Sequence, residues 1–154
     1  ASLVIVGFTI SLHIAGMYAL SPVFGILADR IGRKVTILFG QLMLAVSLLA
    51  TGFGAESEGW VIAGLILLGT GWSAATVAGS ALLTESTPVA RRTRVQGLSD
   101  VLMSAAGATG GALSGVVLLL LGYSGLSLVS LVLVAIVTLR VITRWISPTK
   151  EEAA

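Results

Sequence analysis

The chain has 154 residues, of which 56% are hydrophobic and only 10% are charged, with a formal net charge of +2. Soluble domains are about 25% charged, so this chain cannot cover a globule with polar surface and must face hydrocarbon over most of its exterior. It has no cysteine, which excludes disulfides, thiolate metal sites and cysteine nucleophiles. We therefore expect a membrane protein with a lipid bilayer as its surroundings and no nucleic acid among its partners.

Five apolar runs follow one another along the chain, and each is long enough to cross a bilayer. A hydrocarbon core of about 30 Å requires about 20 apolar residues in a helix. The runs lack the alternation and spacing of barrel strands, and in lipid their backbone groups must be satisfied internally, so we predict helices. They cover approximately residues 2–28, 35–54, 60–84, 95–121 and 124–146. The predicted fold is an all-α, polytopic bundle of five transmembrane helices in a single domain.

Proline and small residues predict how these helices bend and pack. Ser21-Pro22 in the first run removes a backbone donor, and this predicts a kink. Transmembrane helices approach closely where small residues recur at every fourth position. Such stripes occur in the first run (Gly7, Ser11, Ala15, Ala19), the third (Gly71, Ala75, Gly79) and the fourth (Gly107, Gly111, Gly115). We expect these faces to be helix contacts, with direct contact to a substrate as the alternative.

The basic residues predict the orientation in the membrane. All nine lie near the first break, the third break or the C-terminal end, and cytoplasmic loops collect Lys and Arg. We therefore expect the N-terminus outside, the two basic loops and the tail 147–154 in the cytoplasm, and Glu56 and Glu58 on the opposite side. The chain begins at Ala1 inside an apolar run, so we also expect a fragment of a longer protein.

The first break carries the most specific motif of the chain, GILADRIGRK over residues 25–34. It resembles the signature loop of the major facilitator superfamily, which lies between two transmembrane helices. The matching residues are Gly25, Leu27, Asp29, Arg30, Gly32, Arg33 and Lys34. The resemblance implies that Asp29 is anchored at the N-terminus of a helix from the opposite half of a transporter. It also implies that the basic residues complete a cytoplasmic charge network that closes one end. Within this chain, Glu85 is the predicted partner of Arg30 or Arg33.

Two departures from the pattern of the N-terminal half indicate which half the chain resembles. Leu65 stands where that half typically has an arginine, and residues 107–115 lack the proline of a Gly-Pro element. The chain therefore resembles the C-terminal half, helices eight to twelve. This implies secondary active transport of a small solute by alternating access in the plasma membrane, coupled to an ion, together with a missing N-terminal half. The alternatives are the N-terminal half itself and a membrane scaffold that transports nothing.

A few polar and aromatic residues inside the runs are candidates for substrate or proton binding. His13, the single histidine, lies near the middle of the first run, where ionisable groups are costly, and histidine is the residue type commonly used for proton transfer. It either acts in coupling or substrate binding, or is a neutral imidazole hydrogen-bonded to a neighbouring helix. Trp72 and Tyr18 are weaker candidates for substrate contact.

Gln96 and Asp100 lie on one face at the cytoplasmic end of the fourth run, and Asp100 lies about 8 Å inside it. This depth suits a gate that contacts the missing half; capping, local hydrogen bonds and substrate contact are the alternatives. The chain has no pair of metal-binding residues at helical spacing and no phosphate-binding glycine loop. We therefore expect no enzyme activity, no cofactor and no metal site.

Overall fold

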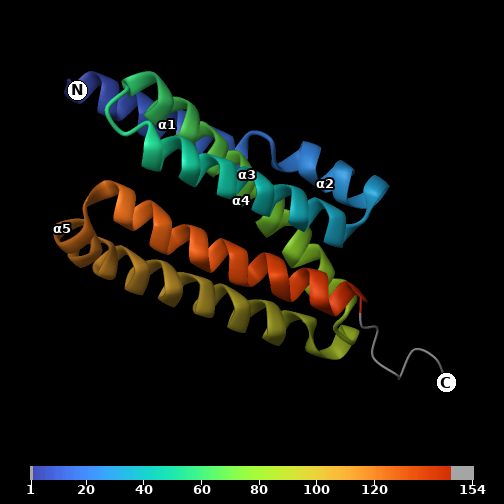
Figure 1. Cartoon of the computed structure of the whole chain (residues 1–154). Helices are drawn as coiled ribbons and strands as arrows, with labels where there is room; N and C mark the ends of the chain where they lie inside the picture. The colour runs from blue at the N-terminus through green and yellow to red at the C-terminus, as the bar shows by residue number, and fades with distance from the viewer. Residues whose placement is uncertain (1, 147–154) are drawn as a thin grey trace.

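The computed structural model describes residues 2–146, with the side chains of the last two of these left aside. The described chain is helical almost throughout (Figure 1). Its elements in order are α1 Leu3–Tyr18, α2 Ser21–Ile31, α3 Arg33–Phe53, α4 Glu58–Glu85, the short 3-10 helix η1 Val89–Arg91 and α5 Arg92–Ile146. The all-α fold class predicted from the sequence is confirmed. The predicted cytoplasmic tail 147–154 lies outside the described residues.

Four segments of the described chain are long and apolar enough to cross a membrane, by length and composition. They are Leu3–Ile31, Arg33–Phe53, Glu58–Glu85 and Val89–Arg144. The first is interrupted between Tyr18 and Ser21, because Pro22 stands in the first turn of α2; the kink predicted at Ser21-Pro22 is confirmed.

The last segment has 56 residues, about 84 Å of helix, which is far longer than one bilayer crossing. It is broken at Gly122, whose φ of 68° and ψ of −174° are not helical. The two arms of α5, residues 92–121 and 123–146, run in opposite directions from this break (Figure 1). The predicted runs 95–121 and 124–146 correspond to these arms, and the count of five crossings stays a prediction.

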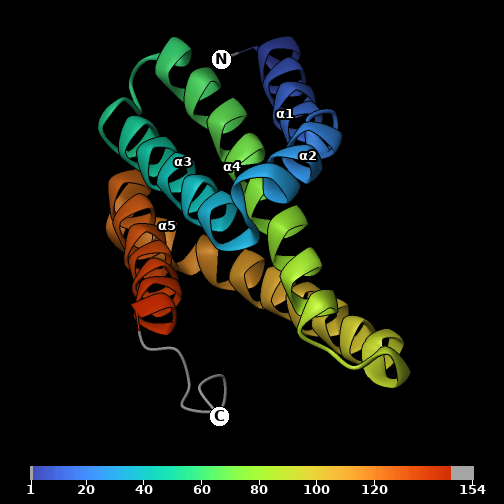
Figure 2. The ribbon, with the colours of Figure 1, turned by 90° about the vertical axis from the view of Figure 1, so that its right-hand side faces the viewer.

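Helix α4 is the centre of the packing, with α1 and α2 on one side and α3 on another (Figure 2). The helices touch through small residues. A Cβ atom on Gly40 of α3 would lie 2.8 Å from the carbonyl oxygen of Gly71, and one on Gly69 would lie 2.3 Å from the carbonyl oxygen of His13. Backbones therefore meet directly on both sides of α4. The sequence predicted that Gly71 would be a contact residue of this helix, and it lies against α3.

The interior of the bundle is made mostly of small and hydroxyl-bearing side chains, with Phe24 and Ile37 as large apolar members. Thr36, Ser47, Ser73, Ala74 and Ala78 are fully buried. Ser47 donates a hydrogen bond from Oγ to the carbonyl oxygen of Gly64, at 2.7 Å. Large apolar side chains cover the outside instead. This inside-out distribution is that of helices whose solvent is lipid, where small residues permit close packing.

The two ends of the bundle differ in charge. The α2–α3 turn, the link after α4 and the C-terminal end of α5 lie at one end, and the N-terminus, the α3–α4 loop and the bend of α5 lie at the other (Figure 1). The basic residues of the described chain therefore gather at one end, whereas Glu56 and Glu58 lie at the opposite end. We refer to these as the basic end and the acidic end.

Candidate functional site

The turn between α2 and α3 at the basic end is built around Gly32. Its φ of 98° and ψ of 148° belong to a region that L side chains rarely adopt, so glycine is required here for conformation. The side chain of Thr36 donates to the Gly32 carbonyl oxygen at 3.0 Å and is fully buried. The glycine thus ends one helix and starts the next within a single residue, which brings Asp29 and Arg33 onto the same side of the turn.

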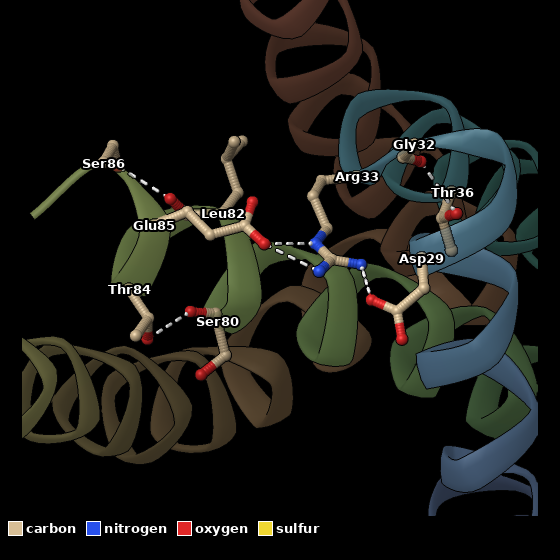
Figure 3. Close-up of polar contacts among 9 residues, drawn as sticks. All are labelled: Asp29, Gly32, Arg33, Thr36, Ser80, Leu82, Thr84, Glu85 and Ser86. Atoms are coloured by element: carbon tan, nitrogen blue, oxygen red, sulfur yellow. Dashed lines mark hydrogen bonds and ion pairs between the residues drawn. The ribbon is translucent and has the colours of Figure 1, made fainter.

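The guanidinium group of Arg33 lies between two carboxylates from different helices (Figure 3). Its Nη2 and Nε atoms donate to Oε1 of Glu85 at 2.7 and 3.1 Å. Its Nη1 atom donates to Oδ1 of Asp29. The sequence predicted Glu85 as the partner of Arg30 or Arg33, and the structure pairs it with Arg33. We call Asp29, Arg33 and Glu85 the ion network.

Hydroxyl groups fix the end of α4 on which Glu85 stands. Ser86, the C-terminal capping residue, donates from Oγ to the carbonyl oxygen of Leu82 at 2.7 Å, and Thr84 donates to that of Ser80 at 2.9 Å (Figure 3). The side chains of Asp29 and Glu85 remain 66% and 55% exposed. These bonds close the last turns of α4 beside Glu85, while the network stays open toward the surroundings of this chain.

The other members of the signature loop occupy the same turn. Arg30 and Lys34 are exposed at the basic end, and Gly25 is half-buried on α2 with open space at its Cβ position. The resemblance placed Asp29 against a helix of the opposite half; in this chain Asp29 binds Arg33.

Gln96 connects the first arm of α5 to α4. Its Nε2 atom donates to Oγ of Ser80 at 2.6 Å, while its Oε1 atom is buried and has no hydrogen-bond partner among the described residues. Asp100 is exposed one turn further along. A neighbouring groove of about 570 Å³, lined by Thr76, Val77, Ser80, Ala81, Thr84 and Glu85, runs from this contact to the ion network. Glu85 thus lines this groove, and Gln96 is bonded to Ser80, which also lines it.

His13 is half-buried in the contact between α1 and α4. Its Nδ1 atom lies 2.7 Å from the carbonyl oxygen of Leu65, and because a carbonyl oxygen only accepts, Nδ1 carries the proton and donates. This is the hydrogen bond to a neighbouring helix that was one of the two alternatives for His13. Nε2 takes no part in this bond, so a further role in coupling stays a prediction.

Tyr18 and Trp72 contact each other across the same contact surface, with ring centroids 6.1 Å apart in an edge-to-face arrangement. Ser21 and Ser73 lie beside them, with Oγ atoms 3.2 Å apart. His13 and Tyr18 of α1 and Ser21 at the start of α2 therefore contact α4 in chain order. Their partners are Leu65, Trp72 and Ser73, respectively. The structure thus brings the three predicted substrate or proton candidates to one surface, which we call the α1–α4 seam.

The glycines of α5 lie elsewhere. Gly107, Gly111 and Gly115 have nothing within 4 Å of their Cβ positions, and residues 101–110 are all exposed. Among residues 2–146 these glycines pack against no other helix, so their predicted role in helix packing stays a prediction for a contact with another part of the protein.

The sequence analysis did not predict most of the glycines at which the helices approach each other most closely. Gly7 of the predicted first stripe meets open space, whereas Gly16 faces the carbonyl oxygen of Ile66. Gly40, Gly64 and Gly69 also lie against other helices. The available signal was His13, because a polar side chain that is costly to expose to lipid marks the face that packs against another helix, and Gly16 lies on that face.

The long apolar helices, the small-residue interior and the two differently charged ends define a multi-pass α-helical membrane protein. The model of the family described as Major Facilitator Superfamily matches residues 1–154. The chain belongs to this family.

Two relatives from Bacillus subtilis (strain 168) are similar to most of the chain. The uncharacterized MFS-type transporter YddS is 43% identical over 129 residues, which are 83% of this chain and 30% of YddS. The uncharacterized MFS-type transporter YdeG is 40% identical over 137 residues, 86% of this chain and 32% of YdeG. The riboflavin transporter RfnT of Brucella anthropi is 30% identical over 91 residues, 59% of this chain and 23% of RfnT. The chain thus spans about a third or less of the length of these relatives. No solved structure matches it significantly.

Proposed function

We propose that this chain forms the C-terminal half, helices eight to twelve, of a secondary transporter that moves a small solute by alternating access. Membership of the family and the fraction of its relatives that the chain spans support a part of such a transporter. The choice of the C-terminal half rests on Leu65 and on the missing proline in residues 107–115. In such transporters the substrate binds near the bilayer midplane between two halves that rock against each other. The proposed partners are thus the bilayer, a small solute and an N-terminal half.

The observation that carries the proposal is the position of Arg33 between Asp29 and Glu85. One planar guanidinium group presents several donors in a fixed fork and can hold two carboxylates at once. It ties the α2–α3 turn to the end of α4, and the exposed part of Asp29 is left available to a helix of the other half. We infer that this network is the cytoplasmic gate surface on this side of the transporter.

The orientation and the coupling are part of the same proposal. With the basic end in the cytoplasm, as the distribution of Lys and Arg favours, the ion network lies at the inner mouth of the pathway in the plasma membrane. His13 lies between this end and the acidic end, bonded to α4. A proton on its second ring nitrogen would add a charge at mid-depth, so His13 is the proposed coupling residue, for export or import.

Accessibility of the groove beside Glu85 tests the gate. The chain has no cysteine, so a Thr76→Cys reporter in a full-length protein freed of other cysteines reports on this groove alone. We expect an impermeant maleimide to label the reporter from the basic end faster when Glu85→Gln weakens the network. Glu56→Gln, the same change at the acidic end, is the matched control and should leave the rate unchanged.

A network with reversed charges tests whether charge pairing is what slows labelling of the Thr76→Cys reporter. Exchanging only Arg33 and Glu85 would place two acidic groups side by side, because Asp29 also binds Arg33. The triple variant Asp29→Arg, Arg33→Glu, Glu85→Arg restores attraction at both contacts. It should label more slowly than Glu85→Arg alone. Equal labelling of wild type, Glu85→Gln and the triple variant would remove the gate and favour a scaffold.

A further inference from the structure

Two aromatic side chains of the α1–α4 seam lie at an unusual depth. Tyr18 is near the middle of the segment Leu3–Ile31, and Trp72 is near the middle of Glu58–Glu85. Tyr and Trp are enriched at the two membrane interfaces, where the polar tip of each ring reaches water or headgroups. At mid-depth neither ring has headgroups within reach, so their placement requires another explanation.

The two rings also present unoccupied surface. They meet edge to face at 6.1 Å between centroids, which fixes their relative orientation. Tyr18 is nevertheless 62% exposed, and Trp72 is only partly buried. Most of the Tyr18 ring thus projects beyond the packed seam with its partner beside it. A pair of fixed aromatic rings with free faces is a surface on which another planar ring can stack.

The helix break beside Tyr18 supplies a hydrogen-bond acceptor. In a continuous helix the carbonyl oxygen of Tyr18 would accept from the N–H of residue 22, but residue 22 is proline and has no N–H. The preceding carbonyl, that of Met17, accepts from Oγ of Ser21 at 3.2 Å. Irregular backbone at membrane depth is tolerated where it is buried in protein or lines a cavity. The Tyr18 carbonyl is therefore suited to a donor carried by a solute.

The surrounding charges indicate a neutral solute. The permanently charged residues of α1, α2 and α4 are Asp29, Arg30, Glu58 and Glu85, and all of them lie at helix ends. His13, which also lies on the seam, is bonded to Leu65 through Nδ1 and gains a charge only when its second ring nitrogen is protonated. A charged solute at the level of Tyr18 and Trp72 would thus find no permanent counterion on these three helices, and an unpaired charge in a membrane is costly.

We propose that Tyr18, Trp72 and the Tyr18 carbonyl oxygen form one wall of a binding site for a neutral, planar aromatic solute that carries a ring N–H donor. The inference rests on the proposed transport function, since it names the class of solute. The rings stack on the solute, and the carbonyl oxygen accepts its N–H. Ser21 and Ser73 hold the broken helix against α4 and so position the carbonyl.

Theophylline and caffeine test the two parts of this site. Both are neutral planar purines, and caffeine differs by a methyl group in place of the ring N–H of theophylline. We expect the full-length transporter in lipid nanodiscs to bind radiolabelled theophylline saturably and caffeine more weakly. Saturable binding of neither purine overturns the inference. Equal binding of both overturns the role of the carbonyl oxygen.

Single substitutions then test whether theophylline binds at these two rings. Loss of one stacking ring weakens binding by about 1–3 kcal/mol in comparable cases, or about 5- to 150-fold. We expect a loss in this range for Trp72→Leu and Tyr18→Leu, and less than about threefold for Tyr18→Phe, which keeps the ring. Trp60→Leu is the matched control, because Trp60 stands on the same helix α4 but is 59% exposed near the acidic end.

The outcomes separate this site from the transport proposal. The site would be overturned if Trp72→Leu bound theophylline as tightly as the wild type does. It would also be overturned if Trp60→Leu lost as much affinity for theophylline as Trp72→Leu. The maleimide labelling at Thr76 does not depend on these rings, so an intact gate response without theophylline binding would reject the site alone. Theophylline binding without any gate response would reject the gate and leave the site standing.

Discussion

Gly69 is the position where a single methyl group should disturb the seam most. A Cβ atom there would lie 2.3 Å from the backbone carbonyl oxygen of His13, whereas ordinary contacts begin at 3.4 Å. The obstacle is backbone, so α1 must move away from α4 by about 1 Å in Gly69→Ala, since interiors are close-packed. That movement stretches the 2.7 Å bond from His13 to Leu65. Overpacking of this kind typically costs about 1–3 kcal/mol of stability.

Gly79→Ala is the matched control, because Gly79 lies on the same helix and has nothing within 4 Å of its Cβ position. We expect Gly69→Ala to lower the apparent unfolding temperature of the full-length protein in detergent, measured by size-exclusion chromatography after heating. Gly79→Ala should be neutral or slightly stabilising, since alanine favours helix over glycine. Equal unfolding temperatures for Gly69→Ala and wild type would refute the direct contact between α1 and α4.

Three further changes have expected outcomes. Ser47→Ala removes a buried hydrogen bond to Gly64 and should cost about 0.6 kcal/mol, at most about 1.7, in the same heating assay; an unaltered unfolding temperature would argue against the bond. Gly122→Ala places a side chain at a φ of 68° and a ψ of −174°, a region that only glycine adopts readily, and should lower stability by about 1–3 kcal/mol in the same assay. An unchanged unfolding temperature would contradict the bend. Pro22→Ala restores an N–H to the broken helix and should slow amide hydrogen exchange at residues 19–21, which carry an amide hydrogen in both proteins. Unchanged exchange at these residues would contradict the break.

Much of the fold could be predicted from composition and from single special residues. Lipid leaves helices as the solution for long apolar runs outside barrels, and Pro22 locates the interruption of the first segment because proline acts locally. The sequence limited the partner of Glu85 to Arg30 or Arg33, because charged residues avoid the membrane interior and gather at helix ends. The structure pairs Glu85 with Arg33.

The rotation of each helix about its axis could not be predicted in the same way. Apolar residues surround α1, and the stripe through Gly7 was chosen by the spacing of small residues alone. His13 was the one clear sequence signal for the face toward α4, and that prediction did not use it. The structure turns α1 so that Thr9, His13 and Gly16 face inward. Likewise the edge-to-face contact of Tyr18 with Trp72 depends on the register between two helices, which the sequence does not encode locally.

Labelling of single cysteines from each side of the membrane tests the central claim most directly, namely that the helices cross the bilayer with the basic end in the cytoplasm. Lys34→Cys and Glu56→Cys place reporters at exposed positions of opposite ends. An impermeant maleimide should label Lys34→Cys only in inside-out vesicles and Glu56→Cys only in intact cells. Labelling of Lys34→Cys in intact cells would contradict the orientation, and with it the assignment of the ion network to a cytoplasmic gate.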